Sequence, residues 1–215
     1  CQGYSEPNAG SDLAALQTSA VKDGDKWIIN GQKVWTSFGH VADRCFLLAR
    51  TNRYDKKHKG ITAFLLDMNQ EGVETRPIIQ MDGKHDFNEV YLNNAVAYDA
   101  DIVGAVDEGW RVSIALLMHE RTGIGAQVFT LEQQFNDLVA VTKELEADGE
   151  PLMNDPFVQR TMVDLYARSR GSLLNYYRNL TKQLKQGHPG VEGSMDKLIV
   201  SELTKDLFSQ AISLQ

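Results

Sequence analysis

Cysteine is scarce in this chain, and its scarcity argues against two classes of site. Only Cys1 and Cys45 occur among the 215 residues, so neither a disulfide framework nor a cysteine-based zinc site is expected. The five histidines are scattered, with no pair at the spacing of metal ligands, and we expect no metal. A reducing compartment fits this composition best.

Long hydrophobic runs and an excess of positive charge are also missing. The longest apolar run, residues 114–118, is too short to cross a bilayer, so no membrane span is predicted. The net charge of -7 and the pI near 5.2 argue against nucleic acid or an anionic membrane surface as the main partner. The remaining composition, 42% hydrophobic and 24% charged, is typical of a soluble globular protein. The chain begins with Cys and shows no signal or transit peptide, so we expect a fragment or a processed chain.

Residues 1–106 have the pattern of a small antiparallel β-domain. Strands are predicted around residues 18–22, 27–29, 33–37, 45–49, 61–66, 73–79 and 89–98. Asp23-Gly24 and Asn30-Gly31 are dipeptides typical of tight hairpins, so a hairpin is predicted at each. Six or more strands without a helix-length segment between them indicate a barrel or sandwich and not a βαβ nucleotide fold.

From residue 107 the hydrophobic period changes to steps of three and four, which predicts an up-down helical bundle over 107–215. We predict one long first helix, with the apolar stripe Trp110, Ile114, Leu117, Ile124, Val128, Leu131, Phe135 and Leu138. Asp155-Pro156 predicts the start of a second helix that runs to Gly187. Ser194 is the expected N-cap of a third helix, with Asp196 in its first turn.

The third helix shows no C-cap before Gln215, so we expect the bundle to be incomplete. The expected fold class is therefore α+β with two domains, 1–106 and 107–215.

Two hydroxyl-bearing blocks stand out in the β half. The first block is YSEPNAGSD at residues 4–12, where Pro7 and Gly10 break regular structure beside the hydroxyls of Ser5 and Ser11. The second block is INGQKVWTS at residues 29–37, where the flat face of Trp35 stands beside Thr36 and Ser37. Such surroundings suit a planar ligand with polar edges, and two ordinary β-turns would have the same composition.

A charged pair interrupts the apolar stripe of the first helix. Arg121 occupies a position where the stripe requires a hydrophobic residue, and Glu120 precedes it. Gly123 and Gly125 follow, although each glycine inside a helix costs about 1 kcal/mol relative to alanine. A buried, unpaired guanidinium is also costly. Both a ligand site and an inter-helix salt bridge with tight packing explain this pattern.

The two blocks, in this order and at this separation, resemble the middle-domain signature of the acyl-CoA dehydrogenases, flavoproteins that desaturate acyl-CoA thioesters. The resemblance extends through residues 60–65, 87–90 and 109–111. It implies an FAD-dependent enzyme in which a glutamate removes the α-proton while the β-hydrogen leaves as hydride to the flavin. One alternative is an oxidase or monooxygenase of the same fold. The other is a non-catalytic binding module, which gains weight because we expect this chain to lack the family's N-terminal helical domain and last helices.

The resemblance implies FAD contacts from both blocks. The implied cofactor-binding residues are Gln2, Tyr4, Ser5, Gly10, Ser11, Trp35, Thr36 and Ser37. Trp35 stands where an aromatic residue borders the flavin ring, and Ser37 where a hydroxyl meets the hydride-accepting nitrogen. Ser11 stands where the family contacts flavin phosphate or acyl-CoA. Gln2 replaces a frequent tyrosine or phenylalanine, which departs from the family pattern.

His119-Glu120-Arg121 resembles the minority of the family whose catalytic base lies on this helix directly before an arginine. Glu120 is therefore the predicted base, with Arg121 and Ser11 as predicted substrate-binding residues. A carboxylate in a closed apolar pocket has a raised pKa, which suits a general base. In most branches of the family the base instead lies in a C-terminal segment that this chain does not contain.

The resemblance also implies partners. These are an acyl-CoA substrate, an electron-transfer flavoprotein or similar acceptor, and further copies of the chain in a homodimer or homotetramer. The implied role is in fatty-acid and lipid metabolism, in the bacterial cytoplasm or the mitochondrial matrix.

Overall fold

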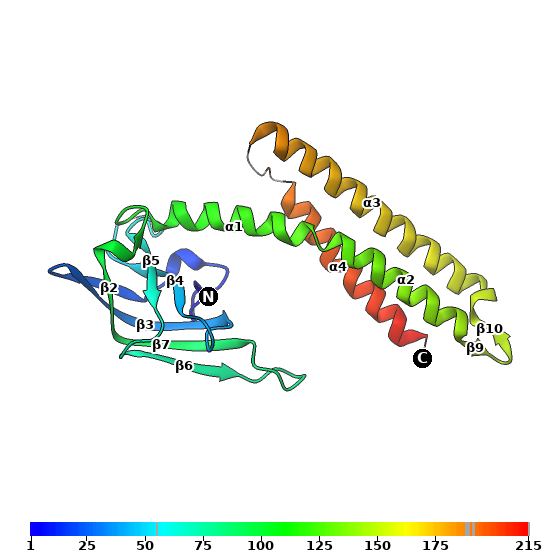
Figure 1. The fold of residues 1–215 in the computed structure, drawn as a ribbon, viewed down its shortest axis with the longest axis horizontal. Helices are drawn as coiled ribbons and strands as arrows, with labels where there is room; N and C mark the ends of the chain where they lie inside the picture. Colours follow the sequence, from blue (N-terminus) through cyan, green and yellow to red (C-terminus); the bar gives the residue numbers. More distant parts are fainter. Residues whose placement is uncertain (55, 188–189, 191, 215) are drawn as a thin grey trace. The chain divides into compact units, whose positions relative to one another are not determined.

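The computed structural model describes all residues except 55, 188–189, 191 and 215, and leaves the side chains of residues 121–122 and 124–125 undescribed (Figure 1). The chain forms two compact units, Cys1–Ala115 and Leu116–Gln215. The division between them falls inside helix α1 (Gly109–Gly125).

The first unit contains an eight-stranded sheet (Figure 1). Its strands are β1 (Gln2–Gly3), β2 (Ser19–Asp23), β3 (Lys26–Ser37), β4 (Arg44–Arg50), β5 (Ile61–Asp67), β6 (Val73–Ile78), β7 (Phe87–Tyr98) and β8 (Ile102–Val103). The strand order is β6-β7-β3-β2-β4-β5-β8, and β1 pairs with β4 beside this path. Among the described pairings of this sheet, β1–β4 and β2–β4 are parallel and the others are antiparallel. The predicted antiparallel β-domain is confirmed, as a sheet that the described pairings leave open.

Alternating side chains along these strands form the core of the first unit. Trp27 and Ile29 of β3 are buried, as expected for positions two apart on one face of a sheet. They pack with Ala20, Cys45, Leu47, Ala49, Phe64, Leu66, Met68, Val90, Leu92, Ala95 and Ala97. Each fully buried large apolar side chain contributes roughly 1.5–3 kcal/mol, so this cluster fixes the strands that carry the two blocks.

The predicted hairpin at Asn30-Gly31 is wrong, because β3 continues through both residues. The pairing with β7 shifts register between Ile29 and Gly31, and Gly31 has a φ of 153°. A Cβ at Gly31 would lie 2.7 Å from the Cα of Thr18, so only glycine lets the strand pass this close to the segment before β2. The dipeptide therefore forms a bulge that bends the strand without reversing it. The hairpin at Asp23-Gly24 is confirmed, since β2 and β3 pair antiparallel as far as Asp23.

The second unit is built from helices. They are the end of α1, then α2 (Val128–Glu144), α3 (Pro156–Gln186) and α4 (Gly193–Ser213). Helices α2, α3 and α4 run side by side in alternating directions (Figure 1). They share a core of Val128, Leu131, Phe135, Leu138, Val158, Met162, Leu165, Leu173, Val200, Leu203 and Leu207. A two-stranded hairpin of β9 (Glu146–Ala147) and β10 (Glu150–Pro151) joins α2 to α3.

The predicted single first helix is wrong, because α1 and α2 are separated by a turn at residues 126–127. The turn follows directly after Gly125, and Gly123 lies two residues before Gly125; the low helix propensity of glycine weakens the end of α1. The predicted stripe is buried from Val128 onward, whereas Ile114 on α1 is 41% exposed.

The predicted start of the second helix is confirmed. The Asp155 carboxylate accepts the backbone N–H groups of Phe157 at 2.6 Å and Val158 at 3.2 Å, and Pro156 opens α3. The helix ends at Gly187, which has a φ of 78°. The predicted cap at Ser194 is wrong, because the carbonyl of residue 192 already accepts helical bonds and α4 begins one residue before Ser194.

Candidate functional site

The fold brings the two blocks together on β3. The backbone N–H of Val34 donates to the carbonyl oxygen of Ser5 at 2.9 Å. Residues 26–30 of β3 pair with β2, and beyond the bulge at Gly31 the strand is free to pair with the first block instead. Since β1 pairs with β4, the first block lies between β4 and the second half of β3.

The first block forms a tight turn. The backbone of Glu6 and Ala9 exchanges two hydrogen bonds, of 3.1 and 3.0 Å, which places Pro7 at an exposed tip. The predicted residues Gly10 and Ser11 are exposed beyond this turn, and Gln2 is exposed on β1. The ring of Tyr4 is buried and packs against Phe46 with 5.9 Å between ring centroids. Ser5 is half-buried.

A buried ion pair also joins the blocks, and the sequence did not predict it. The Nζ of Lys33 lies 2.9 Å from Oε1 of Glu6, with 0% and 8% of the two side chains exposed. Burial raises the pKa of the Glu6 carboxyl, but the Lys33 ammonium, Thr18 and the N–H of Gln17 outweigh it and hold that pKa below its ordinary value. Burial lowers the pKa of Lys33, and Glu6 opposes this change. One feature of the sequence could have indicated a buried ion pair: a lysine stands inside a predicted strand, beside apolar positions that face inward.

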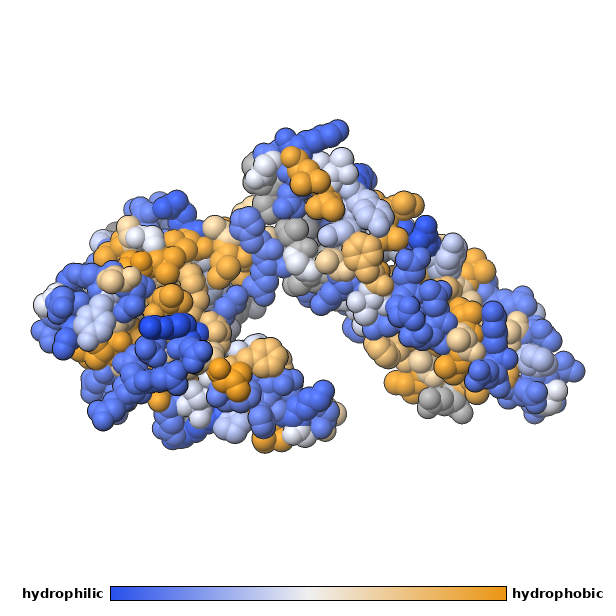
Figure 2. Space-filling view, viewed as in Figure 1, coloured by the Kyte–Doolittle hydropathy of each residue, from blue (hydrophilic) through white to orange (hydrophobic). Residues whose placement is uncertain are grey.

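The second block presents an aromatic face to the surface. A second register shift in the β3–β7 pairing lies between Lys33 and Thr36, and within it Trp35 has a φ of 60°. Positive φ is rare for a bulky residue and stores roughly 1–3 kcal/mol of strain, which is found most often at functional sites. The indole is 60% exposed and meets Phe87 edge-on, with ring centroids 6.3 Å apart. The bulge therefore turns Trp35 out of the sheet. Figure 2 shows apolar side chains left exposed on both units.

The two hydroxyls beside Trp35 face opposite ways. Ser37 is exposed, whereas Thr36 is buried and its Oγ1 has no hydrogen-bond partner in the described structure. The buried amide of Asn88 donates to the Thr36 carbonyl at 3.1 Å and lies 3.2 Å from Nδ1 of His40. These contacts hold the turn after β3, and they leave Ser37 and Trp35 available to a planar ligand with polar edges. The exposed indole and the exposed Ser37 hydroxyl fit a flavin, whereas the Thr36 hydroxyl lies buried on the other face of the strand.

The predicted base and its neighbour lie in the second unit. Glu120 is exposed on the last part of α1. Arg121 follows it in the helix, and its side chain lies outside the described residues. The predicted cofactor residues all belong to the first unit. The structure thus brings together Tyr4, Ser5 and the second block, without placing Glu120 or Arg121 relative to them.

An open cavity of about 510 Å³ lies elsewhere on the first unit. It is lined by Tyr54, His58, Lys59, Val106, Asp107, Glu108, Trp110 and Arg111. The Asp107 carboxylate accepts bonds from Thr51, Asn52 and Tyr54 at 2.6, 2.7 and 2.9 Å, which fixes the loop after β4 to the start of α1. The lining combines aromatic rings and cations with two carboxylates, and Arg111 pairs with Glu108 at 3.0 Å.

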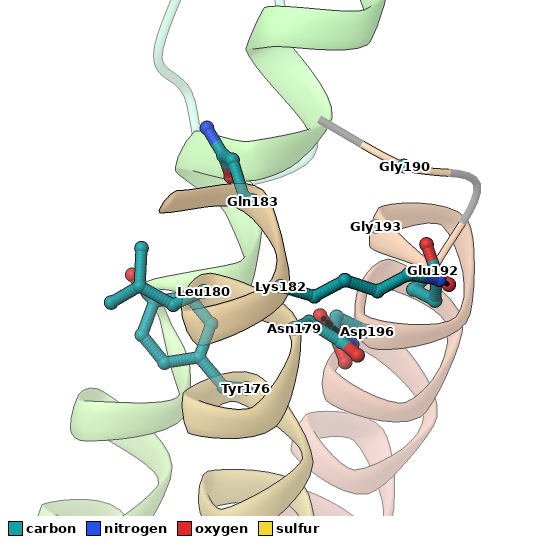
Figure 3. Close-up of a pocket in the computed structure, with 9 residues that line it drawn as sticks. All are labelled: Tyr176, Asn179, Leu180, Lys182, Gln183, Gly190, Glu192, Gly193 and Asp196. Atoms are coloured by element: carbon teal, nitrogen blue, oxygen red, sulfur yellow. Dashed lines mark hydrogen bonds and ion pairs between the residues drawn. The ribbon is translucent and has the colours of Figure 1, made fainter. Parts of the chain in front are cut away.

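The hollow between α3 and α4 is not a ligand site, because polar contacts between the two helices bridge it. Figure 3 shows Asn179 and Asp196 turned toward each other across it, with Lys182 reaching Glu192. The buried Asp196 carboxylate accepts amide bonds from Asn175 at 2.5 Å and Asn179 at 2.8 Å. The hollow holds only about 20 Å³, room for about one water molecule.

The titratable groups of the described residues include potential metal ligands and the buried thiol of Cys45. The described part of the chain contains no cluster of three or more histidine, cysteine, aspartate or glutamate side chains that could hold a metal. Burial raises the pKa of the Cys45 thiol to about 11, so this cysteine is not a thiolate nucleophile at neutral pH. None of the described helices is both long and apolar enough to cross a membrane.

Two family models match this chain. Residues 1–95 match the middle domain of acyl-CoA dehydrogenases, and residues 107–215 match the C-terminal domain of acyl-CoA dehydrogenases. Acyl-CoA dehydrogenase IpdE1 of Mycobacterium tuberculosis is 46% identical over 158 residues, which cover 72% of this chain and 40% of that protein.

Solved structures show the same likeness. The ChsE4-ChsE5 complex from Mycobacterium tuberculosis has 30% identity and a TM-score of 0.85, over 99% of this chain and 55% of that one. The Tcur3481-Tcur3483 steroid ACAD has 28% identity and a TM-score of 0.88, over 99% of this chain and 54% of that one. The matched regions thus span 40–55% of the length of these three relatives.

Proposed function

We propose that this chain, which belongs to the acyl-CoA dehydrogenase family, forms part of an FAD-dependent enzyme that desaturates an acyl-CoA thioester between its α and β carbons. One observation carries the proposal: the two blocks meet on β3, where Val34 bonds to Ser5. Beside this contact a strained bulge exposes the Trp35 indole, and Ser37 exposes its hydroxyl.

Each part of this surface has a role in the proposed site. FAD, when bound, supplies the acceptor for the hydride. Trp35 would border the ring, and the Ser37 hydroxyl would donate a hydrogen bond to it. Further contacts are proposed for Gln2, Tyr4, Ser5, Gly10, Ser11 and Thr36; of these, Thr36 has its hydroxyl buried on the face opposite Ser37. Their hydrogen bonds orient the ring, and orientation is a main source of rate enhancement in a two-partner reaction.

Glu120 is the proposed base, and Arg121 positions the substrate. A general base works best when its pKa lies near the operating pH, which for a carboxylate requires apolar surroundings. Glu120 is exposed within its own unit. Its apolar surroundings in the working enzyme must therefore come from outside that unit, including the acyl chain of the substrate.

The names of the relatives indicate which substrates to test and which kind of assembly to expect. One solved relative is a steroid ACAD, so polycyclic acyl-CoA thioesters belong beside straight-chain ones among the substrates to test. Another is a complex of two named proteins, ChsE4 and ChsE5. We propose an oligomeric enzyme that passes electrons to an electron-transfer flavoprotein. IpdE1 comes from a bacterium, which favours the bacterial cytoplasm over the mitochondrial matrix.

Anaerobic titration with acyl-CoA thioesters tests the function. The purified full-length protein should show flavin absorption that bleaches with an accepted substrate, and a full-length protein without flavin absorption contradicts the proposal. Glu120→Gln should keep the flavin and lose bleaching, whereas Glu144→Gln, an exposed glutamate on α2, should bleach normally. Normal bleaching by Glu120→Gln would show that the catalytic base lies in another segment. Peroxide formation under air at the rate of turnover would favour the oxidase alternative.

A further inference from the structure

Glu6 and Lys33 tie together three segments of the first unit. Besides its 2.9 Å contact with Glu6, the Lys33 ammonium donates to the Tyr4 carbonyl at 3.1 Å. The Glu6 carboxylate accepts the backbone N–H groups of Gln17 at 2.6 Å and Thr18 at 2.9 Å. The pair therefore holds the first block, the second block and the segment that enters β2.

Stability alone does not explain a charged pair at this position. The removal of two charges from water is expensive, and well-packed apolar residues of similar volume are often as stable or more stable. What apolar residues cannot supply is the set of directed bonds to the backbone. Lys33 fixes the carbonyl next to Ser5, and its neighbour Val34 bonds to the carbonyl of Ser5 itself. One residue further along, Trp35 adopts its strained, outward-facing conformation.

We propose that Glu6 and Lys33 are a positioning pair, which fixes the backbone of the first block against the second so that Ser5 and Trp35 meet the flavin ring in one geometry. The proposal rests on the proposed function for the identity of the ligand. It assigns neither residue a contact with flavin or substrate. Their effect passes through the backbone at Tyr4 and Val34.

The test is a double variant, Glu6→Met with Lys33→Met, in the purified protein. It replaces the pair with apolar side chains of similar length, so the fold should persist. Hydrogen exchange of the Val34 amide should become faster, while the amides of β4 and β5 keep their protection. FAD affinity should fall about tenfold or more, with an altered visible spectrum of the bound flavin. Lys22→Met, which removes the lysine of an exposed ion pair in the same sheet, should change none of these readouts.

Two outcomes overturn the proposal. Unchanged exchange at Val34 would show that the pair does not fix the blocks, and unchanged FAD affinity and spectrum would show that it does not set the flavin geometry. If the double variant does not fold, Glu6→Gln decides by the same measurements, because it keeps the volume and one acceptor oxygen. A wild-type protein that binds no FAD refutes the proposed function, while the exchange of Val34 still decides whether the pair fixes the blocks.

Discussion

Val34 and Ser5 are joined by a backbone hydrogen bond of 2.9 Å, although 29 positions separate them in the sequence. This bond exists because β3 bends at Gly31 and leaves β2 before it reaches the second block. The position of the candidate flavin surface therefore depends on a bulge. The effect of the bulge on stability and the role of the flavin surface in cofactor binding can be measured separately.

Gly31→Ala should destabilise the first unit by about 1–3 kcal/mol. The added Cβ would meet the backbone and side chain of Thr18 at 2.5–2.8 Å, and a tightly packed strand yields only at such a cost. Urea unfolding measures the loss. Gly10→Ala is the control, since a Cβ there would meet no atom within 4 Å, and equal losses in both variants would contradict the bulge.

Trp35→Gly should weaken FAD binding by about tenfold, because it removes an aromatic contact with the ring. It should leave stability unchanged or slightly raised, because glycine relieves the positive φ. Phe38→Gly is the matched control, with a φ of 55° and 57% of its side chain exposed, and should bind FAD like wild type. Unaltered FAD affinity in Trp35→Gly would show that Trp35 does not contact the cofactor.

The stability contributed by Glu6 should depend on pH. Burial raises its pKa, but Lys33, Thr18 and the Gln17 N–H hold the folded-state pKa below the ordinary 4.5. The contribution is therefore fully present above the unfolded-state pKa and is lost as the pH falls through the folded-state pKa. The gap in unfolding free energy between wild type and Glu6→Gln should narrow on acidification below about pH 4.5. A gap that stays constant would refute this assignment.

Asp155→Ala should cost about 0.5–2 kcal/mol, because two backbone N–H groups at the start of α3 lose their acceptor. The melting temperature of the protein reports the loss. Asp155→Asn keeps an acceptor oxygen and should lie close to wild type. If the alanine and asparagine variants melt together, the cap contributes nothing.

Local signals were sufficient for most of the fold. The strands at 45–49 and 61–66 and the start of α3 follow from hydrophobic period and capping chemistry, which depend on neighbouring residues alone. The hairpin predicted at Asn30-Gly31 was wrong because the same dipeptide is compatible with a hairpin and with a bulge. The close approach of Gly31 to Thr18, which a local pattern does not contain, selects the bulge. Asp148-Gly149 carries the hairpin signal of Asp23-Gly24 and forms the β9–β10 turn, which sequence reading missed.

The candidate site was only partly predictable for the same reason. Strand alternation could have placed Thr36 on the face opposite Ser37. The Glu6–Lys33 contact joins residues 27 positions apart, so no local pattern specifies it. The exposure of Trp35 depends on a register shift against β7, which is a property of the folded sheet.

The most direct test of the flavin surface is the amount of FAD that remains with the purified protein after incubation with the cofactor and ultrafiltration. The prediction is that wild type retains FAD and that Ser37→Ala and Trp35→Gly retain less. Complete passage of FAD into the filtrate, from wild type and variants alike, would contradict the account.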